Sequence, residues 1–202
     1  MSQRTGEILL LSREPEGELL AKELKKIWNV RIEYTDCIQS KESDYKMIVS
    51  HHYPHIIKSE ELKWVQNFTN LNIHNTFLPY GRGIYGIMWG AYFNTPQGFT
   101  LHALEERVDA GKVLYQEAVE YQDSETLKEL WYRIENQAVS YFLNNLDSLQ
   151  NLYNNARYVS KLESGFYKNK RQSESLLRQL PNGFETPISI VKQLRGKKLI
   201  IR

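Results

Sequence analysis

Short apolar segments alternate with helical patterns along most of the chain, and this alternation restricts the fold more than any other feature. Residues 8–11 form an uninterrupted apolar run, as expected of a strand buried on both faces of a parallel sheet. Leu19, Leu20, Leu24 and Ile27 then follow helical spacing. The pattern predicts an α/β fold with an open, twisted, mostly parallel sheet flanked by helices.

The same two signals repeat further along the chain. We expect further strands at residues 30–34, 47–49, 71–74, 98–101 and 113–119, and further helices at residues 59–68, 83–93 and 124–142. Open sheets of this kind bind ligands outside the carboxyl ends of their strands. Side chains at those ends are therefore the first candidates for a functional site.

The composition changes near residue 154. From there the chain is polar and basic, contains the turn signal Leu180-Pro181-Asn182-Gly183, and ends in a basic and apolar run at 197–202. We predict a main domain over residues 1–153. Residues 154–202 are expected to be a small irregular appendage with a final short helix, packed on the core or at a dimer interface. The terminal run is expected to be an edge strand or a solvated tail.

Charge and cysteine content exclude several classes of protein. With 26 basic and 24 acidic residues, the net charge of +2 gives no electrostatic footprint for nucleic acid. The single cysteine, Cys37, excludes an intrachain disulfide and a multi-cysteine zinc site, and we expect it to be a half-buried apolar side chain. The first apolar run is too short for a signal segment or a membrane span. We therefore expect a cytoplasmic protein without a nucleic-acid or membrane partner.

Asn72-Ile73-His74 lies at the end of a predicted strand. Strand residues two apart point to the same face, so Asn72 and His74 project together. A carboxamide can donate to a developing oxyanion, while an imidazole takes a proton from an attacking amine or also supports the oxyanion. Asp109, in a loop after the strand that contains Thr100, is placed to orient that ring. A strand-end histidine alone is more often structural, so the argument depends on the whole set.

The block from residue 71 to 114 resembles the formyltransferase family that includes glycinamide ribonucleotide transformylase and methionyl-tRNA formyltransferase. The counterparts of that family's signature are Asn72-Ile73-His74, Leu78-Pro79, Gly83, Gly98-Phe99-Thr100 and Asp109-Ala110-Gly111. The resemblance implies a Rossmann-like formyltransferase fold and 10-formyltetrahydrofolate as the formyl donor. It also implies that Asn72, His74 and Asp109 form the catalytic triad.

Two further stretches are similar to the small sugar N-formyltransferases. Residues 50–57 resemble their Ser-Tyr-Gly-Tyr-x-His-Ile-Ile segment, and residues 165–167 with 180–187 resemble their C-terminal segment. In the family, the first loop and the loop before the catalytic aspartate hold the pteridine ring. The resemblance therefore implies folate-binding roles for Tyr53, Pro54, Ile56, Leu78, Glu106, Arg107 and Val108.

The sequence departs from this group in three places. His51 and His52 replace an aromatic residue and a glycine, and Tyr80-Gly81 stands where relatives often carry Trp-Asn. Ser12-Arg13 follows the first strand in place of a glycine-rich phosphate loop, which weakens the case for a ribonucleotide acceptor. We expect acceptor contacts from Tyr80, Arg82 and Tyr85, although Arg82 and Tyr85 are equally consistent with ordinary surface side chains.

A histidine cluster at His51, His52 and His55 raises the question of a metal. Adjacent residues of an extended chain point to opposite faces, and no nearby acid is placed to complete a ligand shell. We expect no metal, and a lining role at the folate pocket for these side chains.

The expected function is transfer of a formyl group to the amine of a nucleotide-linked amino deoxysugar, such as a dTDP-4-amino or 3-amino dideoxyhexose. Alternative acceptors are an aminoacyl group on a carrier protein and glycinamide ribonucleotide. A non-catalytic folate-binding or scaffolding protein is the alternative from another class, and the complete set of Asn72, His74 and Asp109 argues against it. Homodimers are common in the sugar group, and the sequence leaves that state open.

Overall fold

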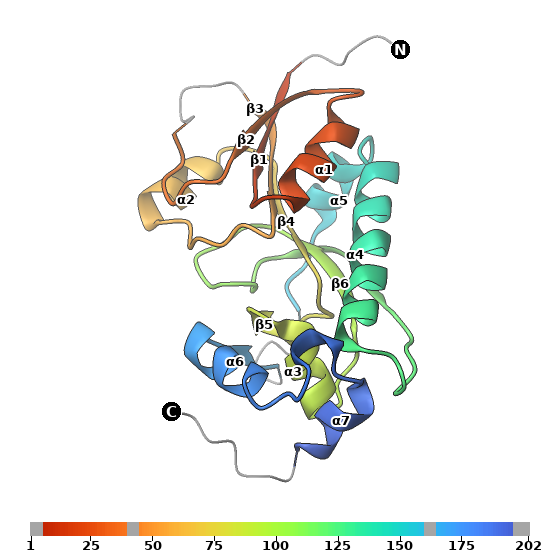
Figure 1. The fold of residues 1–202 in the computed structure, drawn as a ribbon. Helices are drawn as coiled ribbons and strands as arrows, with labels where there is room; N and C mark the ends of the chain where they lie inside the picture. Colours follow the sequence, from red (N-terminus) through yellow and green to blue (C-terminus); the bar gives the residue numbers. More distant parts are fainter. Residues whose placement is uncertain (1–5, 40–44, 160–164, 196–202) are drawn as a thin grey trace. The chain divides into compact units, whose positions relative to one another are not determined.

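The alternating segments form a six-stranded sheet with the order β2-β1-β3-β4-β6-β7 (Figure 1). A computed structural model describes residues 6–39, 45–159 and 165–195. The strands of this sheet are β1 (Glu7–Leu11), β2 (Asn29–Glu33), β3 (Tyr45–His51), β4 (Asn70–His74), β6 (Gly98–His102) and β7 (Val113–Ala118). The predicted α/β fold with a mostly parallel sheet is confirmed.

The first four strands pair in parallel, and β1 and β3 carry the uninterrupted apolar runs expected of buried parallel strands. β1 lies between β2 and β3, and β3 pairs with β4 so that Ser50 is opposite Asn72. Helix α1 (Glu16–Leu24) connects β1 to β2, and α2 (Ser59–Val65) connects β3 to β4. Because these connections run in opposite directions along the sheet, right-handed crossovers place the two helices on opposite faces. Figure 1 shows α1 and α2 on opposite sides of these strands.

Helix α1 buries its predicted apolar positions except Leu19. Gly17, Leu20, Ala21 and Leu24 are buried, whereas Leu19 is 66% exposed. The buried positions follow the spacing of one helical face, and Leu19 lies about 100° away from Leu20 around the helix. The small residues Gly17 and Ala21 allow the helix to approach the sheet closely.

The chain divides into two compact units. The first comprises residues 1–74, 101–115 and 139–158, and the second comprises residues 75–100, 116–138 and 159–202. The apolar core of the first unit includes Leu9, Leu11, Ile38, Tyr45, Ile48 and Val65. Burial of each large aliphatic side chain contributes about 1.5–3 kcal/mol. Helix α5 (Leu149–Asn155) also belongs to this unit. The boundary predicted at residue 153 stays a prediction.

The second unit is assembled around helix α3 (Gly86–Phe93), which is buried along almost its entire length. It also contains a two-stranded sheet of β5 (Arg82–Gly83) and β8 (Tyr167–Lys168), with α6 (Lys170–Leu177), a 3-10 turn η2 (Gly183–Glu185) and α7 (Ile188–Gln193). Helix α4 (Leu127–Asn144) contributes its first two thirds to this unit. The final short helix of the tail is observed, together with α6, which the sequence analysis does not anticipate.

Three further expectations concern the tail and the surface. The run at residues 197–202 lies outside the described residues. Cys37 is half-buried, as expected. Within residues 6–39, 45–159 and 165–195, none of the helices combines the length and the apolar character needed to cross a bilayer.

Candidate active site

Asn72 and His74 project from the same face of β4 in the first unit. The intervening residues Leu71 and Ile73 are buried, whereas Asn72 and His74 are only half-buried. This alternation follows from the strand geometry, which sends successive side chains to opposite faces. A carboxamide and an imidazole are therefore held side by side at the carboxyl end of a central strand.

Asp109 is brought to this pair by the loop between β6 and β7. The amide of Ala103 donates to Lys112 O (N–O 2.8 Å) and closes the base of the loop, and a Cβ on Gly111 would lie only 1.9 Å from Ala103 O. Asp109 itself has φ 49°, in the left-handed region. The tight base and the reversed backbone turn the carboxylate of Asp109 toward β4.

Asp109 lies within contact distance of both other predicted catalytic residues. Asn72 Nδ2 donates to Asp109 Oδ1 at 3.3 Å, and His74 Nε2 lies 3.7 Å from Asp109 Oδ2. The side chains of His74 and Asp109 are only 12% and 10% exposed. A carboxylate beside the imidazole restricts the orientation of its ring. The arrangement provides an N–H donor, an acid–base group and a charge around one point.

A second imidazole, which the sequence analysis assigned no role, completes the group. His102 is the last residue of β6, 2% exposed, and its Nε2 lies 3.2 Å from Asn72 Nδ2 and 3.4 Å from Asp109 Oδ1. Its position at the carboxyl end of a strand, equivalent to that of His74, is the signal that marks it in the sequence. Its ring also packs edge-on against His74, with centroids 5.9 Å apart.

The loops expected to hold the pteridine expose apolar surface in the first unit. Ile56 is 74% exposed and Val108 is 37% exposed, which is unusual for large aliphatic side chains. Pro54, Glu106 and Arg107 are exposed as well. An exposed aliphatic side chain at Val108, next to Asp109 in the sequence, fits the flat face of an aromatic heterocycle. Their role in folate binding stays a prediction.

Tyr53 lies in the same loop as Ile56 and is anchored to the protein. Its hydroxyl donates to Thr35 O, and its ring packs edge-on against His55 with centroids 5.3 Å apart. Burial, followed by the nearby carboxylate of Glu61, raises the pKa of the Tyr53 phenol to about 12. The phenol is therefore neutral at physiological pH, and its ring forms part of the wall of the loop.

The remaining predicted site residues belong to the second unit. The backbone of Leu78 is held by side chains: Thr100 Oγ1 accepts from Leu78 N at 3.2 Å, and Gln116 Nε2 donates to Leu78 O at 2.6 Å. Tyr80 packs against Phe166, and Tyr85, at φ 56°, packs against Phe184. These partners come from the C-terminal segment that resembles the sugar group.

Arg82 is anchored to the same C-terminal segment through its backbone. Its amide donates to Phe166 O at 3.2 Å, within the pairing of β5 and β8. Tyr80, Arg82 and Tyr85 therefore share one structural support in the second unit. Their contacts with an acceptor stay a prediction.

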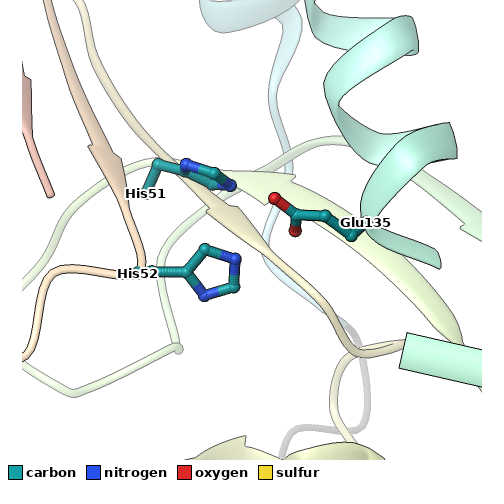
Figure 2. A group of neighbouring side chains, drawn as sticks. All are labelled: His51, His52 and Glu135. Atoms are coloured by element: carbon teal, nitrogen blue, oxygen red, sulfur yellow. The ribbon is translucent and has the colours of Figure 1, made fainter. Parts of the chain in front are cut away.

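The neighbouring histidines at the end of β3 differ from the expectation in orientation. Their rings lie beside each other, with centroids 4.3 Å apart (Figure 2). His52 has φ 53°, so the backbone is not extended there and the two side chains do not point to opposite faces. Glu135, also drawn in Figure 2, belongs to the second unit, where it accepts from Asn75 Nδ2 at 2.6 Å. The expectation that no metal is needed stays a prediction.

Comparison with known proteins places this geometry in a family. The family model described as formyl transferase matches residues 13–146. GDP-perosamine N-formyltransferase of Brucella melitensis is 31% identical over 91 residues, which are 45% of this chain and 35% of that protein. The match thus spans only about a third of the curated relative.

Solved structures share the fold over nearly the whole chain. A formyltransferase from Anoxybacillus kamchatkensis, in complex with UDP-4,6-dideoxy-4-formamido-L-AltNAc and tetrahydrofolate, has a TM-score of 0.80 at 22% identity, covering 92% of this chain and 97% of that one. An N-formyltransferase from Helicobacter canadensis, in complex with folinic acid and dTDP-3-aminofucose, has a TM-score of 0.68 at 16% identity, covering 96% and 80%. The family model matches about two thirds of the residues of this chain, so the chain belongs to the formyl transferase family.

Proposed function

We propose that this protein transfers the formyl group of 10-formyltetrahydrofolate to the amine of a nucleotide-linked amino deoxysugar. The observation that carries the proposal is the grouping of Asn72, His74 and Asp109 at the end of β4 in a chain of the formyl transferase family. This set contains the donor, the acid–base group and the charge that acyl transfer to an amine needs.

In the proposed reaction, the neutral acceptor amine attacks the formyl carbon through its lone pair. As the new C–N bond forms, the carbonyl π electrons move to oxygen, and Asn72 and protonated His74 stabilise the developing oxyanion by donating to it. The carbonyl then re-forms as the bond to the folate nitrogen breaks. The acceptor amine loses one proton, the folate nitrogen gains one, and His74 with Asp109 assists this transfer.

The donor site is proposed in the first unit, between the loop of Tyr53, Pro54 and Ile56 and the segment 106–108. Exposed aliphatic surface from Ile56 and Val108 supports this assignment, because a pteridine ring buries such surface on binding. Leu78 is also proposed to contact the folate through its backbone. Its amide and carbonyl are fixed by Thr100 and Gln116, as a contact with a rigid ligand requires.

The nucleotide-linked sugar acceptor is supported by the named relatives. The protein from Anoxybacillus kamchatkensis is solved with a UDP-linked 4-formamido sugar and that from Helicobacter canadensis with dTDP-3-aminofucose, while the Brucella protein is named for GDP-perosamine. The first two compounds share a deoxysugar linked to a nucleoside diphosphate, which carries a formamido group in one and an amino group in the other, and they differ in the base and in the position of this nitrogen. We propose that Tyr80, Arg82 and Tyr85 recognise this kind of nucleotide-linked deoxysugar. We also propose that the protein is cytoplasmic. Sedimentation analysis will distinguish a monomer from a homodimer.

The decisive experiment incubates the purified protein with 10-formyltetrahydrofolate and a panel of UDP-, GDP- and dTDP-linked 3-amino and 4-amino deoxysugars. Mass spectrometry should detect one added formyl group on at least one acceptor, and the Asn72→Ala variant should lose that activity. Glycinamide ribonucleotide and an aminoacyl carrier protein are included in parallel. If glycinamide ribonucleotide or the aminoacyl carrier protein is formylated while every amino sugar stays unmodified, the proposed sugar acceptor is wrong.

A further inference from the structure

His102 is a buried imidazole whose two ring nitrogens have different surroundings. Its Nδ1 lies 2.9 Å from Ala103 O, and a carbonyl oxygen can only accept, so Nδ1 carries a hydrogen. Its Nε2 lies 3.4 Å from Asp109 Oδ1, longer than the 2.7–2.9 Å or so of a charge-assisted bond. The geometry fits the tautomer in which Nδ1 carries the hydrogen and Nε2 accepts a hydrogen bond.

The carboxamide of Asn72 faces this acceptor with its nitrogen. Asp109 is a carboxylate and can only accept, so the Asn72 atom at 3.3 Å from Asp109 Oδ1 is Nδ2 rather than Oδ1. The same Nδ2 lies 3.2 Å from His102 Nε2. Both neighbours therefore select the same orientation of the carboxamide.

The three atoms form a triangle with nearly equal sides, which determines how the hydrogens of Asn72 are used. Seen from Asn72 Nδ2, the directions to His102 Nε2 and Asp109 Oδ1 diverge by roughly 60°, about half the spread of the two N–H bonds of a carboxamide. A single N–H can point between the two acceptors and be shared by them. The second N–H then points away from both.

We propose that His102 is a positioning residue, which shares one N–H of Asn72 with Asp109 and so directs the other N–H toward the developing oxyanion. This role rests on the proposed formyl transfer. Without His102, the nitrogen of Asn72 is held by Asp109 alone, and the carboxamide can rotate so that its oxygen faces the oxyanion instead. The loss then falls on turnover and not on the binding of either substrate.

Steady-state kinetics on three variants test this role. His102→Leu should lower kcat about tenfold, the value of one ordinary hydrogen bond, with KM for donor and acceptor within about twofold of wild type. His102→Gln, which can place an amide oxygen near the position of Nε2, should recover most of the turnover. The double variant His102→Leu/Asn72→Ala should be no slower than Asn72→Ala alone, because both act through one carboxamide. Leu20→Ala, a buried apolar change in α1, serves as the control for lost stability alone.

An NMR measurement separates this role from the proposed function. The ¹⁵N shifts of the His102 ring should identify the Nδ1–H tautomer, and one Asn72 side-chain hydrogen should lose its protection from exchange in His102→Leu. Wild-type kcat in His102→Leu, or losses that multiply in the double variant, would overturn the positioning role. An inactive wild-type protein with the expected NMR signals would contradict formyl transfer and leave the geometry standing.

Discussion

Asp109 occupies a backbone conformation that limits what can replace it. Its φ of 49° is tolerated by asparagine and strained by about 1–2 kcal/mol for alanine. Asp109→Asn therefore removes the charge beside His74 while keeping the loop, and we expect turnover to fall on the order of a hundredfold. Asp109→Ala should lose similar activity and, in addition, unfold at lower urea concentration. Near-normal turnover of folded Asp109→Asn would remove the carboxylate from the proposed mechanism.

The sequence predicts that Asn72, His74 and Asp109 form one group, and it does not predict that His102 lies beside them. Strand alternation alone places Asn72 and His74 on one face, and the family resemblance adds Asp109. The role of His102 depends on β6 lying beside β4, which is a long-range pairing that no local pattern specifies. The sequence also does not predict that the side chains of His51 and His52 lie beside each other. This arrangement depends on the left-handed backbone of His52, which the residue type does not indicate.

The loop after β4 is held by side chains from two strands, which makes it sensitive to changes outside it. Buried Thr100 accepts from Leu78 N and from Gln116 Nε2 and donates to Thr76 O at 2.7 Å. We expect Thr100→Val, which keeps the shape and leaves these groups unpaired, to lower the free energy of unfolding by about 1–3 kcal/mol. It should also raise KM for the formyl donor, because Leu78 is a proposed contact. Ser124→Ala, at an exposed hydroxyl, is the control in urea denaturation and kinetics. Equal stability of the two variants would contradict this account.

The loop that carries Asp109 depends on the close approach at its base. A side chain at Gly111 would place Cβ 1.9 Å from Ala103 O, which is impossible without moving the backbone. We expect Gly111→Ala to open the bond between Ala103 N and Lys112 O, with a loss of stability of about 1–3 kcal/mol and of nearly all turnover. Amide hydrogen exchange at Ala103 reports the opening directly. Gly183→Ala, where a new Cβ meets nothing within 4 Å and only backbone strain arises, should leave exchange at Ala103 unchanged.

Helix α6 illustrates why the C-terminal elements are harder to predict than the sheet. Its sequence is polar, so it lacks the apolar stripe by which helices are found. It begins with a capping box of Asn169 and Gln172, and the hydroxyl of buried Ser173 accepts from Trp89 Nε1 at 2.9 Å. Both interactions involve polar side chains, one of them with a partner 84 positions away. Apolar periodicity therefore finds the sheet and α4, and misses an element stabilised by polar contacts.

At the scale of the whole molecule, the alternation of apolar runs predicts the order of strands and helices. The right-handed crossover rule then predicts on which face of the sheet each connecting helix lies. What the pattern does not contain is the division of the chain into compact units. Residues 98–102 and 113–118 are single strands in sequence and contribute to both units. Each unit is assembled from three separate segments, so long-range contacts define it and no local pattern in the sequence does.

The tyrosines of the first unit make the stability of the molecule sensitive to alkaline pH. Burial raises the pKa of Tyr53 to about 12 and also raises the pKa of Tyr34 and of Tyr153. An unfolded phenol titrates near pH 10. Between about pH 10 and 12 the native chain therefore holds protons that the unfolded chain has released, so the free energy of unfolding must fall as pH rises. Below about pH 10 both states are protonated and this stabilisation is fully present.

Urea denaturation at a series of pH values, with tyrosinate absorbance recorded in parallel, measures the effect. Tyr53→Phe removes the ionisable group and keeps the ring, so we expect a shallower fall of the unfolding free energy between about pH 10 and 12 than in wild type. Tyr132→Phe, at a side chain that is 52% exposed, is the matched control and should follow the wild-type curve. Identical slopes for Tyr53→Phe and wild type would mean that the Tyr53 phenol ionises as readily in the native chain as in the unfolded one. The anchoring of its loop through Thr35 O would then be too weak to order the proposed donor site.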